Sequence, residues 1–265
     1  MPVKDLQAIR EHGFTILKGV VDLEHIQVLK EKMLEDLAKI TARKDKPYNW
    51  NAGNVQQEPP PMHPYLFKDV LLNEEVIKVS SALLGPGVKN AYYQGNTAMP
   101  RSTERQPVHC DVGQLWRPPD PPGPVFGLVV NVPVVDVSPE NGGTEIWPGS
   151  HQNQAVIHNS GDIKVPLKAL EAQRLEKPPF QLSMRAGDVL IRDIRLWHAG
   201  MPNWTGEPRP MIAMIHWISW WNTETVDFPK GTEDFFKHPV LATQVRFVDG
   251  PVDYIGNSQG YEFSG

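Results

Sequence analysis

The strongest constraint on the fold is the rhythm of residues 89 to 222, where short apolar segments alternate with turns rich in Pro, Gly and Asn. Segments 125–135, 189–197 and 211–221 are rich in β-branched and aromatic residues, which favours strands. Long helical patterns do not alternate with these segments, so parallel βαβ units are not indicated. We therefore expect a mostly β protein with flanking helices and a double-stranded β-helix (jelly-roll) core.

The region before residue 89 has a different pattern, which predicts helices. Asp22 is suited to cap a helix, and Asn73 is suited to cap a second one that ends at Gly85. After Asp22, apolar residues recur at helical spacing, namely Leu23, Ile26, Leu29, Met33, Leu37 and Ile40. Residues 46–64 are rich in Pro, Asn and Gln and are expected to form a long loop of the kind that often covers a binding site.

All 265 residues are expected to form one domain, because β sandwiches and barrels of this length often do. In this interpretation, a helical region of about residues 1–88 precedes the jelly-roll core at about residues 89–222. Residues 223–265 form a C-terminal extension whose pattern is too weak to place.

The composition indicates which partners the protein can bind and in which cellular compartment it lies. The net charge is −5 with acidic and basic residues interspersed, so the chain offers no basic surface for nucleic acid. Its most apolar stretch, residues 211–221, is too short to cross a bilayer. Cys110 is the single cysteine, which excludes an internal disulfide and a thiolate zinc site. We expect a cytoplasmic protein that binds neither nucleic acid nor membrane.

His109, Asp111 and His198 carry the strongest chemical signal. Residues i and i+2 of a strand project to one face, so His109 and Asp111 could reach one ion while Cys110 points away. His198 ends an apolar segment and precedes Ala199-Gly200, where small side chains let a ligand approach the backbone. Two imidazoles and one carboxylate on one side of a metal leave the other side open, which suits a non-haem Fe(II) centre with a cosubstrate and O2.

Each of these residues also has a simpler interpretation. His109 and Asp111 alone could be a surface hydrogen-bonded pair, and a lone histidine at a strand end is more often structural. Arg209 favours the metal site, because a planar guanidinium can grip the far carboxylate of a dicarboxylate that chelates the metal. Thr144, between an Asn-Gly and a Pro-Gly turn, has a hydroxyl that can support that carboxylate or its arginine.

Three segments give the chain a family resemblance: His109-Cys110-Asp111, residues 139–151 (PENGGTEIWPGSH), and residues 197–203 (WHAGMPN) leading to Arg209. In these segments the chain resembles the phytanoyl-CoA dioxygenase family of Fe(II)/2-oxoglutarate-dependent oxygenases. Residues 11–17 (EHGFTIL) look like the opening strand of that family, so the similarity covers roughly residues 6–219.

The resemblance implies specific roles. The metal ligands would be His109, Asp111 and His198, with no further catalytic residue. Arg209 would bind the distal carboxylate of 2-oxoglutarate. Positions that help to hold this cosubstrate in related members are occupied by Gln106, Asn131 and Thr144. Gly200 is a departure, because some members carry a hydroxyl residue there.

The implied reaction uses O2 and 2-oxoglutarate to oxidise a C–H bond of a small or medium-sized metabolite, with succinate and CO2 as coproducts. Hydroxylation is the default outcome, and desaturation, cyclisation and epoxidation stay open. Candidate residues of the substrate pocket are Met211, His216, Trp217 and Arg192. Two other functions remain open: a metal-binding jelly roll that recognises a ligand without redox turnover, and a zinc-dependent hydrolase.

Overall fold

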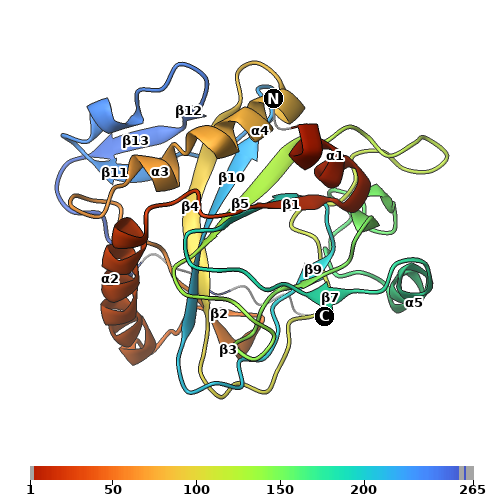
Figure 1. The fold of residues 1–265 in the computed structure, drawn as a ribbon, viewed down its shortest axis with the longest axis horizontal. Helices are drawn as coiled ribbons and strands as arrows, with labels where there is room; N and C mark the ends of the chain where they lie inside the picture. The colour runs from red at the N-terminus through yellow and green to blue at the C-terminus, as the bar shows by residue number, and fades with distance from the viewer. Residues whose placement is uncertain (1–2, 257–259, 261–265) are drawn as a thin grey trace.

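The computed structural model describes residues 3–256 and residue 260. Its centre is a large sheet with the strand order β1-β8-β5-β10-β4-β3-β2, and β12 pairs in parallel with the outer part of β4 (Figure 1). These strands are β1 (Phe14–Leu17), β8 (Val189–Asp193), β5 (Gly127–Pro133), β10 (Arg209–Trp217), β4 (Lys89–Ala98), β3 (Asn51–Gln56), β2 (Tyr48–Asn49) and β12 (Ala242–Thr243). Apart from β12, every neighbouring pair in this sheet is antiparallel.

A smaller antiparallel sheet packs against the large one. It consists of β7 (Phe180–Gln181), β6 (Glu145–Ile146) and β9 (His198–Ala199), with β6 in the middle. Ile146 of β6 shares a buried apolar cluster with Leu190 of β8 and Met211 of β10, so the two sheets form a sandwich. The expected mostly β fold with a jelly-roll core is confirmed.

Helices cover the other face of the large sheet. They are α1 (Val3–His12), α2 (Leu23–Ala42), α3 (Lys68–Leu71) and α4 (Glu74–Leu84). Ile212 and Met214 of β10 pack in the same apolar core as Leu29 and Met33 of α2. A further helix, α5 (Leu167–Glu176), stands at the right-hand margin of the molecule, away from the large sheet (Figure 1).

Both predicted helix caps are present. The Asp22 side chain accepts a hydrogen bond of 2.7 Å from the backbone N–H of Glu24 at the start of α2. Asn73 accepts two such bonds at the start of α4, and α4 ends at Gly85 with φ at 80°. Because these signals depend only on neighbours in the sequence, the local pattern was sufficient to find them.

Other segments differ from the sequence-based expectation. Residues 46–64 are not simply a long loop, because β2 and β3 form a hairpin that extends the sheet through pairing of β3 with β4. The predicted strand 189–197 ends at Asp193, where the Asp193 carboxylate accepts hydrogen bonds from the backbone and guanidinium of Arg195 and fixes a turn. Helix α5 had no counterpart in the prediction.

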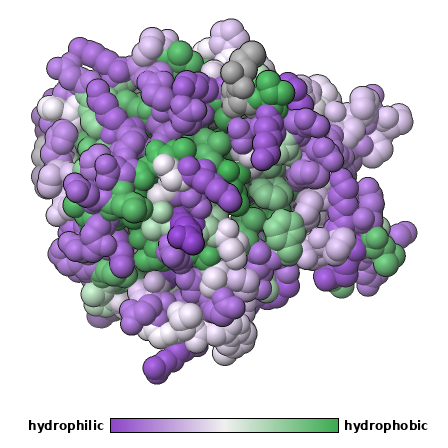
Figure 2. Space-filling model, in the orientation of Figure 1, coloured by the Kyte–Doolittle hydropathy of each residue, from purple (hydrophilic) through white to green (hydrophobic). Residues whose placement is uncertain are grey.

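The C-terminal extension contributes to the folded structure. Strands β11 (Val226–Pro229) and β13 (Val245–Val248) pair in parallel, and a short 3-10 helix, η2 (Glu233–Phe236), lies between them along the chain. Tyr254 donates a 2.6 Å hydrogen bond to the buried carboxylate of Asp36 in α2. The outer surface mixes polar side chains with apolar ones, which gather toward the middle of the face seen in Figure 2.

Candidate active site

The two candidate histidine ligands are placed opposite each other by the main chain. His109 donates its backbone N–H to the carbonyl of His198 at 3.0 Å, and His198 donates to the carbonyl of His109 at 2.9 Å. The ring centroids lie 4.4 Å apart. Asp111 follows two residues later, and its backbone N–H bonds to the carbonyl of Ile194 at 3.2 Å. Cys110 points away from this group into an apolar cluster with Trp147 and Trp197.

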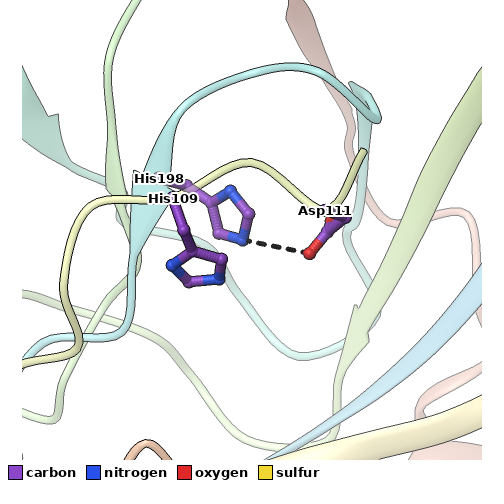
Figure 3. A group of neighbouring side chains, drawn as sticks. All are labelled: His109, Asp111 and His198. Atoms are coloured by element: carbon purple, nitrogen blue, oxygen red, sulfur yellow. Dashed lines mark ion pairs between the residues drawn. The ribbon is translucent and has the colours of Figure 1, made fainter. Parts of the chain in front are cut away.

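The three side chains converge on one space, with one potential ligand atom from each lying within 4.8 Å of the others. His198 Nε2 is 3.6 Å from Asp111 Oδ1, the contact dashed in Figure 3. In both histidines Nδ1 faces a backbone carbonyl, that of Pro107 for His109 at 2.8 Å and that of Leu196 for His198 at 3.0 Å. The proton therefore sits on Nδ1, which leaves the Nε2 lone pair to bind a metal ion.

The protonation states suit a divalent cation. Burial lowers the pKa of His109 and lowers that of His198 well below its usual value, so both imidazoles are neutral. Burial raises the pKa of Asp111, but the Arg192 cation, whose Nη1 lies 2.7 Å from Asp111 Oδ2, outweighs this effect and brings that pKa to about 2. A metal ion would meet a carboxylate and two neutral imidazoles, without competition from protons near neutral pH.

Arg209 is the first residue of β10 and is only 2 % exposed. Its Nη2 donates a 2.7 Å hydrogen bond to the carbonyl of Gly142, whereas Nε and Nη1 are buried without a hydrogen-bond partner among the described residues. Burial lowers the pKa of Arg209 to about 10, so the group stays cationic at neutral pH. A buried guanidinium with unsatisfied donors suits a carboxylate, the group that 2-oxoglutarate would bring.

The other candidate cosubstrate residues line the same cavity, whose volume is about 330 Å³. Gln106 accepts a 2.8 Å hydrogen bond from the backbone N–H of Gly200, and its Nε2 donates to the Asn49 carbonyl at 3.3 Å. Asn131 accepts a long hydrogen bond of 3.4 Å from Arg192 Nε. Thr144 lines the cavity just before β6.

Close packing explains why glycine occupies position 200. A Cβ atom there would lie 2.7 Å from Gln106 Oε1 and 2.8 Å from Asn54 Nδ2. A larger residue at this position would displace the Gln106 amide, so the close approach of Gln106 requires glycine here.

Of the four residues expected in the substrate pocket, Met211, Trp217 and Arg192 line the cavity. The expectation for His216 is wrong. Strand alternation turns His216 to the helix-covered face of β10, where its Nδ1 lies 2.8 Å from Ser80 Oγ of α4.

Sequence reasoning missed the contribution of the β2–β3 hairpin. Trp50, in the turn between these strands, lines the cavity with its ring centroid 5.1 Å from that of His109. Its φ of 72° is a left-handed conformation that a bulky residue seldom adopts. The sequence feature that could have indicated this contribution is a single tryptophan within a polar segment. The ion pair of 2.7 Å between Arg192 Nη1 and Asp111 Oδ2 was also missed.

Comparison with known proteins identifies the class. Residues 9–211 match the family model of phytanoyl-CoA dioxygenase (PhyH). The chain belongs to the phytanoyl-CoA dioxygenase family. The resemblance inferred from the motifs is thereby confirmed, and so is the expected class of enzyme, the Fe(II)/2-oxoglutarate-dependent dioxygenases, at the level of the family.

Relatives and solved structures agree with this family assignment. The chain is 26 % identical over 223 residues to "Dioxygenase af480" of Aspergillus fumigatus, in a match that covers 81 % of this chain and 66 % of that relative. Its fold is similar to that of EctD from S. alaskensis, solved with 2-oxoglutarate and 5-hydroxyectoine, with a TM-score of 0.66, 18 % identity and coverage of 95 % and 88 % of the two chains. HygX from Streptomyces hygroscopicus, solved with nickel, 2-oxoglutarate and hygromycin B, gives a TM-score of 0.60 and 15 % identity over 91 % and 97 % of the chains.

Within the described residues, no helix combines the length and the apolar character that a membrane span requires.

Proposed function

We propose that this member of the family uses Fe(II), held by His109, Asp111 and His198, and 2-oxoglutarate, held by Arg209, to oxidise a C–H bond of a small or medium-sized metabolite. The observation that carries the proposal is the buried Arg209 guanidinium, whose Nε and Nη1 lack partners among the described residues in a cavity that also contains the three ligands. A buried cation with unsatisfied donors is costly, so a carboxylate ligand would relieve that cost.

When bound, Fe(II) and 2-oxoglutarate supply the oxidising chemistry, with O2 consumed and succinate and CO2 formed. The protein supplies positioning. Hydrogen bonds from the Nδ1 atoms of His109 and His198 to carbonyls hold both rings with Nε2 toward the metal space. Arg192 holds the second carboxylate oxygen of Asp111, which favours coordination through the other oxygen alone. Arg209 sets the direction of the cosubstrate by binding its distal carboxylate.

The alternatives fit this arrangement less well. A metal-binding protein without turnover, and a zinc-dependent hydrolase, could both use two histidines and one aspartate. Neither needs a fully buried arginine with two unpaired donors in the same cavity. That residue favours a site that takes a dicarboxylate.

A small-molecule substrate is supported by the cavity volume of about 330 Å³, which is at the lower end of the range for ligand pockets. The ligands named with EctD and HygX, 5-hydroxyectoine and hygromycin B, are likewise small molecules. Hydroxylation is the proposed default outcome. The proposal includes a reducing, cytoplasmic location, for which the single, buried and unpaired Cys110 is the support.

The proposal is tested by anaerobic titration of the protein with Fe(II) and 2-oxoglutarate, followed through the visible charge-transfer band of their chelate. We expect the band to saturate at one equivalent of iron in the wild type. Iron binding without the band would refute the proposal and favour one of the two alternatives. Succinate formation in air, with Fe(II) compared against Zn(II), is the second measurement, and activity with Zn(II) in the absence of 2-oxoglutarate would favour the hydrolase.

A further inference from the structure

The pocket contains more positive charge than the anions of the proposed chemistry balance. Among the described residues that line it, the charged side chains are Asp111, Arg192 and Arg209, since both histidines are neutral. Arg209 is assigned to 2-oxoglutarate under the proposed function, on which this inference rests. Arg192 is left with a 2.7 Å ion pair to Asp111 and a 3.4 Å hydrogen bond to Asn131.

The two arginines lie in different parts of the pocket. Arg192 of β8 is in register with Val129 of β5, which is in register with Ile215 of β10. Arg209 begins β10, six residues before Ile215, which corresponds to about 20 Å along the strand. The two arginines are therefore well separated along the backbone of the pocket wall. Arg192 is beside the metal ligands, through its ion pair with Asp111.

The charges of the loaded site do not balance without a further anion. The two charges of Fe(II) cancel the two of 2-oxoglutarate, and the Asp111 carboxylate cancels one arginine. One positive charge then remains in a pocket where both arginine residues are at most 6 % exposed. An uncompensated buried charge is unfavourable, so the site selects a ligand that brings one negative charge and disfavours a cationic one.

Apolar residues line the cavity beside Arg192. Val129, Ile194 and Ile215 line the same part of the cavity, and the indole of Trp217 adds an aromatic surface. From these contacts and the unbalanced charge we infer that the primary substrate is a small molecule with a hydrocarbon body and a single carboxylate, and that this carboxylate pairs with Arg192 next to the metal. Arg192 is thus a specificity-determining residue of the active site.

The test uses the full chain under anaerobic conditions with Fe(II) and 2-oxoglutarate, and three matched probe pairs: benzoate, phenylacetate and hexanoate, each beside its primary amide. Calorimetry measures the dissociation constant of each probe, and the chelate band shows that 2-oxoglutarate stays bound. We expect at least one acid to bind about ten- to a hundredfold more tightly than its amide, the range for a hydrogen-bonded pair with a charged group. We expect this preference to disappear in Arg192→Met and to be retained in part in Arg192→Lys.

Arg174→Met is the matched control. It removes the same side chain from α5, where the guanidinium lies 4.9 Å over the ring of Trp147 outside the cavity, and should leave the preference unchanged. Equal binding of acids and amides by the wild type, no binding of any acid, or a preference that survives in Arg192→Met would each overturn the inference.

Iron affinity of the variants separates this role from a purely structural one. If Arg192→Met lost iron together with acid binding, Arg192 would act only by holding Asp111, and the substrate role would be overturned. If the chelate band formed normally but no acid preference existed, the inference would fall while the proposed function stood. Absence of the chelate band in the wild type would refute both the proposed function and this inference.

Discussion

Substitution of Arg209 gives the most direct test of how the cosubstrate is held. The Arg209 guanidinium is fully buried, donates to one carbonyl, and has two donors without partners among the described residues. A bound carboxylate would accept hydrogen bonds from the guanidinium and neutralise its charge. Arg209→Ala should therefore weaken 2-oxoglutarate binding by about 3–5 kcal/mol, the usual cost of breaking a buried charge pair, which is more than about a hundredfold in dissociation constant.

The assay is the 2-oxoglutarate titration of the Fe(II)-loaded protein, read through the chelate band. Iron affinity is measured in the same sample and should be unchanged, because Arg209 is not one of the three clustered ligands. Arg209→Lys should recover only part of the affinity, since an ammonium provides the charge without the planar pair of donors. Without 2-oxoglutarate, Arg209→Ala should cost little stability, because the wild type buries unsatisfied donors there. A dissociation constant within a few-fold of the wild type in Arg209→Ala would refute this reasoning.

Further outcomes are expected. Alanine at each of the three metal ligands should abolish succinate formation while circular dichroism stays native, and turnover with normal iron affinity would exclude that residue as a ligand. Zn(II) or Co(II) should inhibit the Fe(II) enzyme by occupying the site, which a metal competition assay measures. Gly200→Ser should raise the KM for 2-oxoglutarate, because its Cβ would meet Gln106 at 2.7 Å; an unchanged KM would show that the Gln106 amide is not needed. Burial lowers the pKa of His216 from 6.5 to about 4, so the unfolded chain binds the proton more readily and stability should fall as the pH drops from about 6.5 to about 4. Urea denaturation should show a flatter pH dependence in His216→Gln, and identical profiles would contradict this.

The cluster of the three proposed metal ligands could be predicted because its signals are local. His109 and Asp111 are two residues apart, and His198 follows a recognisable apolar segment, so strand geometry alone suggested a common face. The pairing that brings the two histidines together depends on register between distant segments, which the sequence does not encode locally. For the same reason the contact between Arg192 and Asp111 could not be read from the sequence.

The errors have equally definite causes. Side chains alternate along a strand, so Met211 and Trp217 of β10 point to one face and His216 points to the other. The three residues could therefore not all line one pocket. The β2–β3 hairpin was missed because its residues are polar and its stability comes from pairing with β4. Asp193 and Arg195 form a buried ion pair at the turn that ends β8. Because the residues on both sides of this turn are apolar, the sequence pattern resembled one continuous strand.

The position of β2 and β3 at one end of the large sheet has a consequence for how such an enzyme diversifies. The two proposed histidine ligands are held by reciprocal main-chain hydrogen bonds between two segments in the interior of the fold, whereas the cavity wall that contains Asn49 and Trp50 belongs to the outermost hairpin. Substitutions, insertions or deletions in that hairpin can reshape the wall without disturbing the chemistry. Substrate preference and reaction type can therefore evolve separately, and we expect close relatives with different substrates to differ most in residues 48–56.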